Sequence, residues 1–264
     1  MRGLRGLPGL VLGYLKANLQ AALEYRVGFA SQVLSMLVND LMWLTFWLAY
    51  FSRFPLVQGW GREQVATMWA VVAAGFGVGV TVAGNANFLA GLIARGQMDF
   101  YLALPRPVLP HALVSRMELT APGDVLFGLL VFGVVAHPGA AQWALFAVLV
   151  LTTALIIVSF TVMAHSLAFW LGDAESLAME LWGALISFST YPTVIFRGPV
   201  RVLLFTVLPA GFIAYVPVEL LRRFSWPLMG AVVGFSALMV AASTAVFRAG
   251  LKRYESGNLL AGRQ

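Results

Sequence analysis

The sequence predicts an all-α membrane protein with six transmembrane helices. Three observations carry this prediction: 60% of the 264 residues are hydrophobic, only 11% are charged, and the mean hydropathy is +0.85. Soluble domains carry roughly 25% charged residues, and fewer charges leave too little polar surface to cover a fold in water. Apolar runs of about 20 residues, enough to cross a bilayer, recur between short polar links. We therefore expect a single transmembrane domain over residues 1–264.

The N-terminal segment, residues 1–27, is expected to form an amphipathic helix that lies in the membrane interface. Its leucines recur at helical spacing and its polar residues follow another face, an arrangement typical of interfacial helices. The leucines are Leu12, Leu15, Leu19 and Leu23, and the polar residues are Lys16, Gln20 and Glu24.

Six apolar segments are expected to span the bilayer. They cover approximately residues 28–51, 65–93, 120–135, 142–171, 177–195 and 226–247. The second is rich in small residues, and Gly75 and Gly79 form a GxxxG pair that lets another helix approach closely. The helix that packs on this pair belongs either to the same chain or to a second subunit, and the sequence does not decide between them.

Residues 94–116, after the second span, have a different character. Polar residues interrupt the apolar run, and Pro105, Pro107 and Pro110 forbid a continuous helix. Between them, an apolar stripe is expected on a short helix that faces the cytosol. The stripe consists of Met98, Tyr101 and Leu102. Such a stripe needs either a hydrophobic groove on a partner or a lipid surface on which to lie.

The segment from Val200 to Leu221 is long and apolar enough to span the membrane, but Pro209, Gly211 and Pro217 are expected to break it. We predict two half-helices, residues 200–208 and 212–221, that form a re-entrant hairpin before the last span. Broken backbone at membrane depth must be shielded, so this hairpin should pack against its neighbours. A seventh span would instead place the C-terminus on the opposite side.

The basic residues predict the orientation. With six spans, most of the 17 lysines and arginines fall on the side that holds both termini, so both termini should be cytoplasmic. The net charge of +6 does not indicate nucleic-acid binding, because the cations are scattered singly between apolar runs.

Motifs for catalysis, nucleotide binding and metal binding are missing, so we expect no enzyme activity and no cofactor. Lys16 and Lys252, the two lysines, both follow leucine, which excludes a P-loop. The chain has no cysteine, and its three histidines lie on separate segments without a zinc motif. His165 is expected to form a hydrogen bond to a neighbouring helix.

Asp40 is the one acid expected well inside a span, with Asn39 beside it. Acids at membrane depth are costly and mark ion paths, substrate paths or subunit contacts, so these two residues are candidates for the translocation path or a subunit contact. Asp124 and Glu118, near the start of the third span and close to Arg116, are expected to pair at the interface.

Several short motifs carry a resemblance to a known family. They are the "YR..F" entry to the first span (Tyr25, Arg26, Phe29), "LALPRP" (residues 102–107), "FW" (169–170), "YPTVIFRGPVR" (191–201), "VLPAGFIAYVPVE" (207–219) and the tail "RYESGN" (253–258). In this order and spacing the chain resembles the permease subunit of ABC transporters of the type-2, exporter-like class. The resemblance is to the bacterial branch in which the ATPase is a separate polypeptide.

This resemblance implies a division of labour. The short helix with Met98, Tyr101 and Leu102 would be the coupling helix that docks on ABC ATPase subunits. A second permease, identical or different, would complete the translocation path in a bacterial plasma (inner) membrane. The family does not determine the substrate. A secondary transporter, a membrane-embedded enzyme using His165 or Asp40, and a membrane scaffold without an ATPase partner are the alternatives.

Overall fold

A computed structural model describes residues 6–118 and 120–254, and the tail motif from residue 255 onward lies outside them. The described residues are almost entirely helical. In order, the helices are α1 (Leu7–Glu24), α2 (Arg26–Arg53), α3 (Arg62–Ala83), η1 (Gly84–Phe88), α4 (Leu89–Ala94), α5 (Met98–Leu102), α6 (Val108–Val114), α7 (Pro122–Ala136), α8 (Ala140–Ser166), α9 (Ala168–Leu171), α10 (Glu175–Ser189), η2 (Thr193–Ile195), α11 (Gly198–Thr206), η3 (Gly211–Tyr215), α12 (Val216–Arg222) and α13 (Trp226–Leu251).

Four helical stretches of the described chain are long and apolar enough to cross a bilayer. They are Arg26–Arg53, Arg62–Ala94, Ala140–Leu171 and Trp226–Leu251, and a bent pair, Gly198–Thr206 with Gly211–Arg222, would make a fifth if it counted as one span. α7 is apolar but has 15 residues, and α10 has 15 residues and includes Glu175 and Glu180. At 1.5 Å per residue each extends about 22 Å, short of a core of about 30 Å. The count of six spans therefore stays a prediction.

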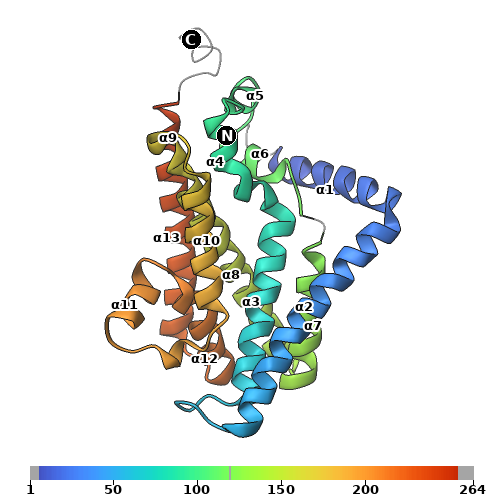
Figure 1. Cartoon of the computed structure of the whole chain (residues 1–264), viewed down its shortest axis with the longest axis vertical. Coiled ribbons are helices and arrows are strands. Elements are labelled where there is room, and N and C mark those ends of the chain that lie inside the picture. The colour runs from blue at the N-terminus through green and yellow to red at the C-terminus, as the bar shows by residue number, and fades with distance from the viewer. Residues whose placement is uncertain (1–5, 119, 255–264) are drawn as a thin grey trace.

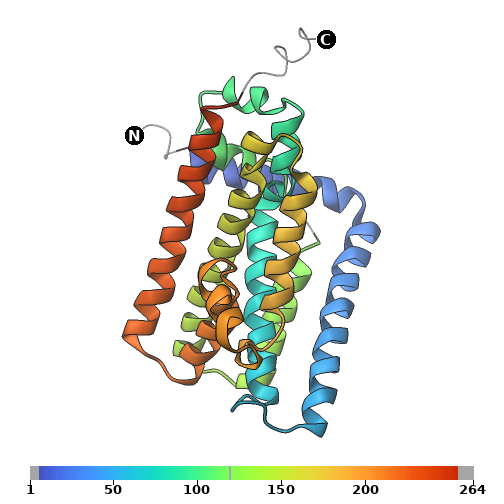
Figure 2. The ribbon, with the colours of Figure 1, turned by 60° about the vertical axis from the view of Figure 1, so that its left-hand side comes forward.

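The long helices run side by side. In Figure 1, α2, α3, α7, α8, α10 and α13 follow the long axis of the molecule, and α1 lies across one end of them. That end also holds α4, α5, α6 and the C-terminal end of α13; we call it the α5 end. The opposite end, the α12 end, holds α12 and the loop between α2 and α3. Figure 2 shows α2 (blue) and α13 (red) at opposite edges of the bundle.

A helix, α1, is present where the sequence predicts an interfacial helix. The four leucines of its apolar face, Leu12, Leu15, Leu19 and Leu23, are all exposed. An apolar face that no other element covers, on a helix lying across the end of the bundle, is the arrangement expected of a helix resting on lipid.

The interior of the bundle is built on close approach of small residues on α3. A side chain at Gly75 would collide with Thr153 of α8, and one at Gly79 would lie 3.4 Å from the Ala154 carbonyl oxygen. Gly77, on another face of α3, would meet the Ala121 carbonyl oxygen at 2.7 Å, next to the start of α7. The GxxxG pair is therefore occupied by α8 of the same chain, which decides for packing within the chain.

The break before the last long helix lies close to the predicted position. α11 ends at Thr206, the next helix begins at Gly211, and the two axes differ by 80°. In Figure 1, α10 descends from the α5 end, whereas α13 starts at the α12 end, so the broken segment does not return to the α5 end. The prediction that Pro217 also breaks the segment is wrong. Pro217 lies in the first turn of α12, directly after the π-helical turn Gly211–Tyr215, where its missing N–H is tolerated.

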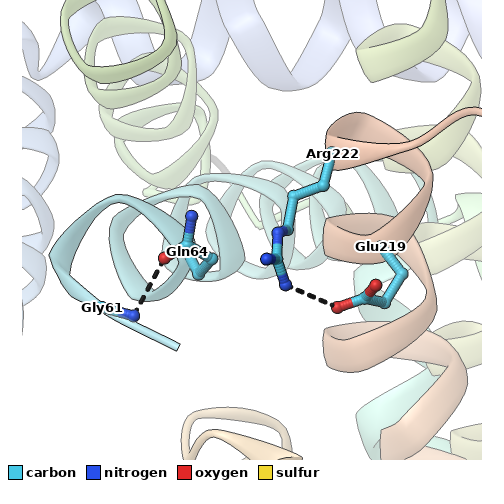
Figure 3. Close-up of polar contacts among 4 residues, drawn as sticks. All are labelled: Gly61, Gln64, Glu219 and Arg222. Atoms are coloured by element: carbon cyan, nitrogen blue, oxygen red, sulfur yellow. Dashed lines mark hydrogen bonds and ion pairs between the residues drawn. The ribbon is translucent and has the colours of Figure 1, made fainter. Parts of the chain in front are cut away.

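Aromatic rings pack the broken segment against its neighbours, as the shielding argument requires. Phe212 stacks on Phe235 of α13 with ring centroids 3.9 Å apart, and Tyr215 stacks on Trp60 at 5.9 Å. Two short polar contacts lie near the helix ends in this region (Figure 3). The Gly61 N–H donates to the Gln64 side chain at 2.9 Å at the start of α3, and Arg222 donates to Glu219 at 3.0 Å within α12.

Candidate functional site

The first candidate site is the short helix α5, reached through a sharp turn in which Gly96 adopts a φ of 71°. The expectation that Met98 and Tyr101 face the cytosol is wrong: their exposed fractions are 0% and 8%. The outward side chains are Phe100 and Leu102, at 61% and 44%. Met98 and Tyr101 are three residues apart and share one face of the helix, and this face is turned inward.

Tyr101 joins α5 to the end of the α3 stretch through a polar network. Its hydroxyl lies 2.8 Å from the Ser115 hydroxyl. The amide of Asn85, a buried residue in η1, donates to Ser115 at 3.0 Å and to the Ala112 carbonyl oxygen at 2.7 Å. Asn85 also lies 3.4 Å from the Tyr101 hydroxyl. Because hydrogen bonds are directional, the network holds α5 in one orientation relative to η1 and α6.

Further polar contacts tie the α5 end to α10 and to the end of α13. Arg95 and Glu175 form an ion pair at 3.6 Å between the α4 end and α10. Burial, together with the interaction with Asp99, raises the pKa of Tyr254, which follows α13, to about 12. The α5 segment is therefore connected to α10 and to the end of α13.

The interfacial helix is attached at the same end. The Tyr14 hydroxyl of α1 lies 3.0 Å from Nε2 of His111 on α6. Burial of His111 and the nearby charge of Arg106 hold the pKa of the imidazole below its ordinary value, so the neutral ring is favoured. A hydrogen bond thus joins α1 to α6.

The second candidate site is a pair of acids between the long helices. Asp40 of α2 and Asp124 of α7 are buried, at 6% and 2% exposure, and their carboxyl groups interact with each other. Asn39 also contacts the Asp40 carboxyl group. In each acid one carboxyl oxygen is buried without a hydrogen-bond partner among the described residues.

The partner of Asp40 was not predicted. We expected Asp124 to pair with Arg116, but the Arg116 guanidinium lies over the Phe88 ring at 3.8 Å instead. The available signal was position: Asp124 lies in the first turn of α7 and is the one charged residue of that apolar helix. Sequence spacing alone could not show that α2 would pass beside that turn.

The acids line a cavity of about 310 Å³ between α2, α3, α7 and α10. Asn39 lines it as well, together with Trp43, Trp69 and Phe76. The Trp43 and Trp69 rings stack with centroids 6.3 Å apart, and Nε1 of the buried Trp69 has no partner among the described residues. Asn39 and Asp40, which the sequence singled out, therefore lie at the same cavity.

His165 has the structural contact that we expected. The side chain is fully buried, and its Nδ1 accepts a hydrogen bond of 3.4 Å from the Ala90 amide of α4. Within the described ranges, groups of three or more histidine, aspartate or glutamate side chains arranged to hold a metal ion are not found.

Comparison with protein families supplies the identification. Residues 37–258 match the family model described as ABC-2 family transporter protein. The chain belongs to the ABC-2 transporter family. The matched range of this ABC-2 permease begins within α2, just before Asn39 and Asp40, and includes α5 and the broken segment. No curated protein and no solved structure matches the chain.

The family and the helices together confirm the predicted class. The chain is an ABC transporter permease, a multi-pass membrane protein whose described part contains several helices of spanning length. Helix α1 lies before the matched range.

Proposed function

We propose that this permease is the transmembrane subunit of an exporter driven by a separate ATPase subunit. It would form the translocation path together with a second permease, identical or different, in a bacterial plasma membrane. α2, α3, α7, α8, α10 and α13 would make six passes, with both termini cytoplasmic and the α5 end toward the cytosol. The bilayer can thin around helices as short as α7 and α10 at modest cost.

The observation that carries this proposal is the pair of exposed side chains on α5. A helix that docks into a groove must present apolar side chains outward, as Phe100 and Leu102 do. It must also be joined firmly to the spans if a displacement at the ATPase is to reach them. The contacts of Tyr101 and Asn85 supply that connection.

A secondary transporter is the second candidate function, and the acid pair favours it. Ionisable groups at membrane depth form ion and proton paths in such carriers. Transport that continues without ATP hydrolysis would support this candidate over the exporter.

The coupling proposal is tested in the complex with the ATPase subunit, reconstituted in lipid. Phe100→Ala combined with Leu102→Ala should abolish the stimulation of ATP hydrolysis by the permease, because the groove loses both of its apolar contacts. The matched control is Leu130→Ala with Val134→Ala, which removes two exposed apolar side chains from α7. Full stimulation by the α5 variant would show that α5 lies on lipid rather than on the ATPase.

The orientation is tested by labelling single cysteines, since the chain has no native cysteine. Arg201→Cys and Arg223→Cys should both react with an impermeant reagent from outside the cell, because the broken segment enters and leaves on one side. Lys252→Cys should be protected. A protected Arg223→Cys with an externally labelled Lys252→Cys would establish a seventh span.

A further inference from the structure

The acid pair needs either a shared proton or a counter-charge, and the described residues that line its cavity provide no counter-charge. Asp40 and Asp124 come from different helices and contact each other in a buried setting. Two carboxylates so close, away from water, are stable only with a shared proton or with a cation beside them. Lysine, arginine and histidine are not among the described residues that line the cavity. A cation in the cavity would therefore interact with both acids without competition from a basic side chain of the lining.

The walls of the cavity point to an organic cation. Trp43 and Trp69 present stacked aromatic rings, and Phe76 lines the same space. Aromatic faces attract ammonium groups through the ring quadrupole, most strongly where water is excluded. Asn39, Ser187 and Thr190 add oxygen atoms to those of the two acids, but most of the lining side chains are apolar, which favours an organic cation over a metal ion of the calcium type that needs six or more oxygen ligands.

A second, independent feature of the cavity wall is a buried hydrogen-bond donor without a partner. Nε1 of Trp69, a side chain that is 5% exposed, is buried without a partner among the described residues. A buried donor without a partner destabilises the fold. An occupant with an acceptor atom would satisfy this donor while its cationic group met the acids.

The cavity is accessible from the sides of the bundle. Asn39 of α2 and Ser187 of α10 both line it and are both exposed. In the apolar window of α2, 17% of the residues are buried inside the chain. In the apolar window of the stretch Arg62–Ala94, which contains α3, 78% are buried. A ligand with an apolar body dissolved in the bilayer would therefore meet this face of α2 directly.

We propose that the cavity between α2, α3, α7 and α10 binds an organic ammonium ion with an apolar body, its charge held between Asp40 and Asp124. The idea that this cation is the transported substrate rests on the proposed exporter function. The binding of the cation in the cavity does not depend on that function. The acid pair would hold the cationic group, and Trp43, Trp69 and Phe76 would surround it.

Binding is tested on the purified full chain in lipid nanodiscs, with phenyltrimethylammonium as the probe. Its neutral isostere, tert-butylbenzene, has the same shape without the charge. The wild type should bind the cation at least about tenfold more tightly than the isostere, as expected for a close charge pair out of water. This comparison needs no variant, and equal affinities would overturn the proposal. Binding of calcium that excludes the organic cation would overturn it as well.

Variants assign the charge preference to the acids. Asp40→Asn combined with Asp124→Asn should remove the preference for the cation and still bind tert-butylbenzene, because the cavity keeps its shape. Asp173→Asn, which removes an exposed acid outside the cavity, is the matched control and should keep the preference. A preference retained in the double variant would overturn the assignment.

Protection of a cysteine locates the bound probe even if the double variant fails to fold. Ser187→Cys lines the cavity and should react with a maleimide several-fold more slowly when phenyltrimethylammonium is present. Equal rates with and without the cation would place the probe elsewhere and overturn the site.

The two proposals fail in different ways. If the cation binds but the ATPase is insensitive to the α5 double variant, the site stands and the exporter proposal fails. If the α5 variant uncouples the ATPase but the wild type binds cation and isostere equally, the exporter proposal stands and the cation site fails.

Discussion

The two ends of the helix bundle are held together by different interactions. At the α5 end, side-chain hydrogen bonds and an ion pair join α5 and its neighbours to α1, η1 and α10. At the α12 end, stacked rings hold the broken segment, such as Phe212 on Phe235 and Trp60 on Tyr215. Hydrogen bonds hold one geometry, as the coupling proposed for the α5 end requires. Ring packing buries broken backbone and suits an end that must be shielded.

The largest effect on stability is expected at the α12 end. Trp60 is 2% exposed and stacks on Tyr215, so Trp60→Ala leaves a large cavity. We expect it to destabilise the fold by about 3–5 kcal/mol, measured by thermal unfolding in detergent. Trp226→Ala removes a 77% exposed indole and should change stability little. Equal effects of the two changes would contradict the contrast between the ends.

A smaller loss of stability with a larger loss of coupling is expected at the α5 end. Asn85→Leu removes the donor that Ser115 and the Ala112 carbonyl oxygen share. Leaving these groups unpaired should cost about 1–3 kcal/mol. Stimulated ATP hydrolysis should fall further than stability accounts for. Gln20→Leu, an amide change at an exposed position of α1, is the control. Normal coupling by Asn85→Leu would show that the network is not needed for transmission.

A pH effect is expected at the attachment of α1. The folded state lowers the pKa of His111 from an unfolded value near 6.5, so the unfolded chain binds the proton more readily. Stability should therefore be complete above about pH 6.5 and decline as the pH falls below it. His111→Gln removes the titrating ring, and its melting temperature should depend less on pH between 5 and 7. An unchanged pH profile in this variant would exclude His111 as the cause.

The smallest effect is expected from the ion pair at the α12 end. A guanidinium nitrogen of Arg222 lies 3.0 Å from a carboxylate oxygen of Glu219, and both side chains are partly exposed. Exposed ion pairs contribute about 0–1 kcal/mol to the free energy of unfolding. Arg222→Gln should change the melting temperature only slightly, and the residual effect should shrink as salt is added. A loss as large as that of Trp60→Ala would show that polar contacts also hold the α12 end.

The break before α13 shows what local chemistry predicts well. The half-helices were predicted at residues 200–208 and 212–221 and are found at Gly198–Thr206 and Gly211–Arg222. Proline and glycine act on their own backbone, so the position of a break follows from local sequence. Pro217 was misjudged because a proline in the first turn of a helix disturbs it little.

The sequence by itself determined that the chain is a membrane protein and at which residues its helices break. It also determined that Asn39 and Asp40 are unusual, as polar residues within an apolar stretch. These properties depend on composition and on neighbours along the chain. Only the tertiary structure decided that Met98 and Tyr101 turn inward while Phe100 and Leu102 turn outward. It likewise decided that Asp40 meets Asp124. Periodicity shows that a helix has an apolar face, but which face is covered depends on helices distant in sequence, whose packing is set by contacts between them.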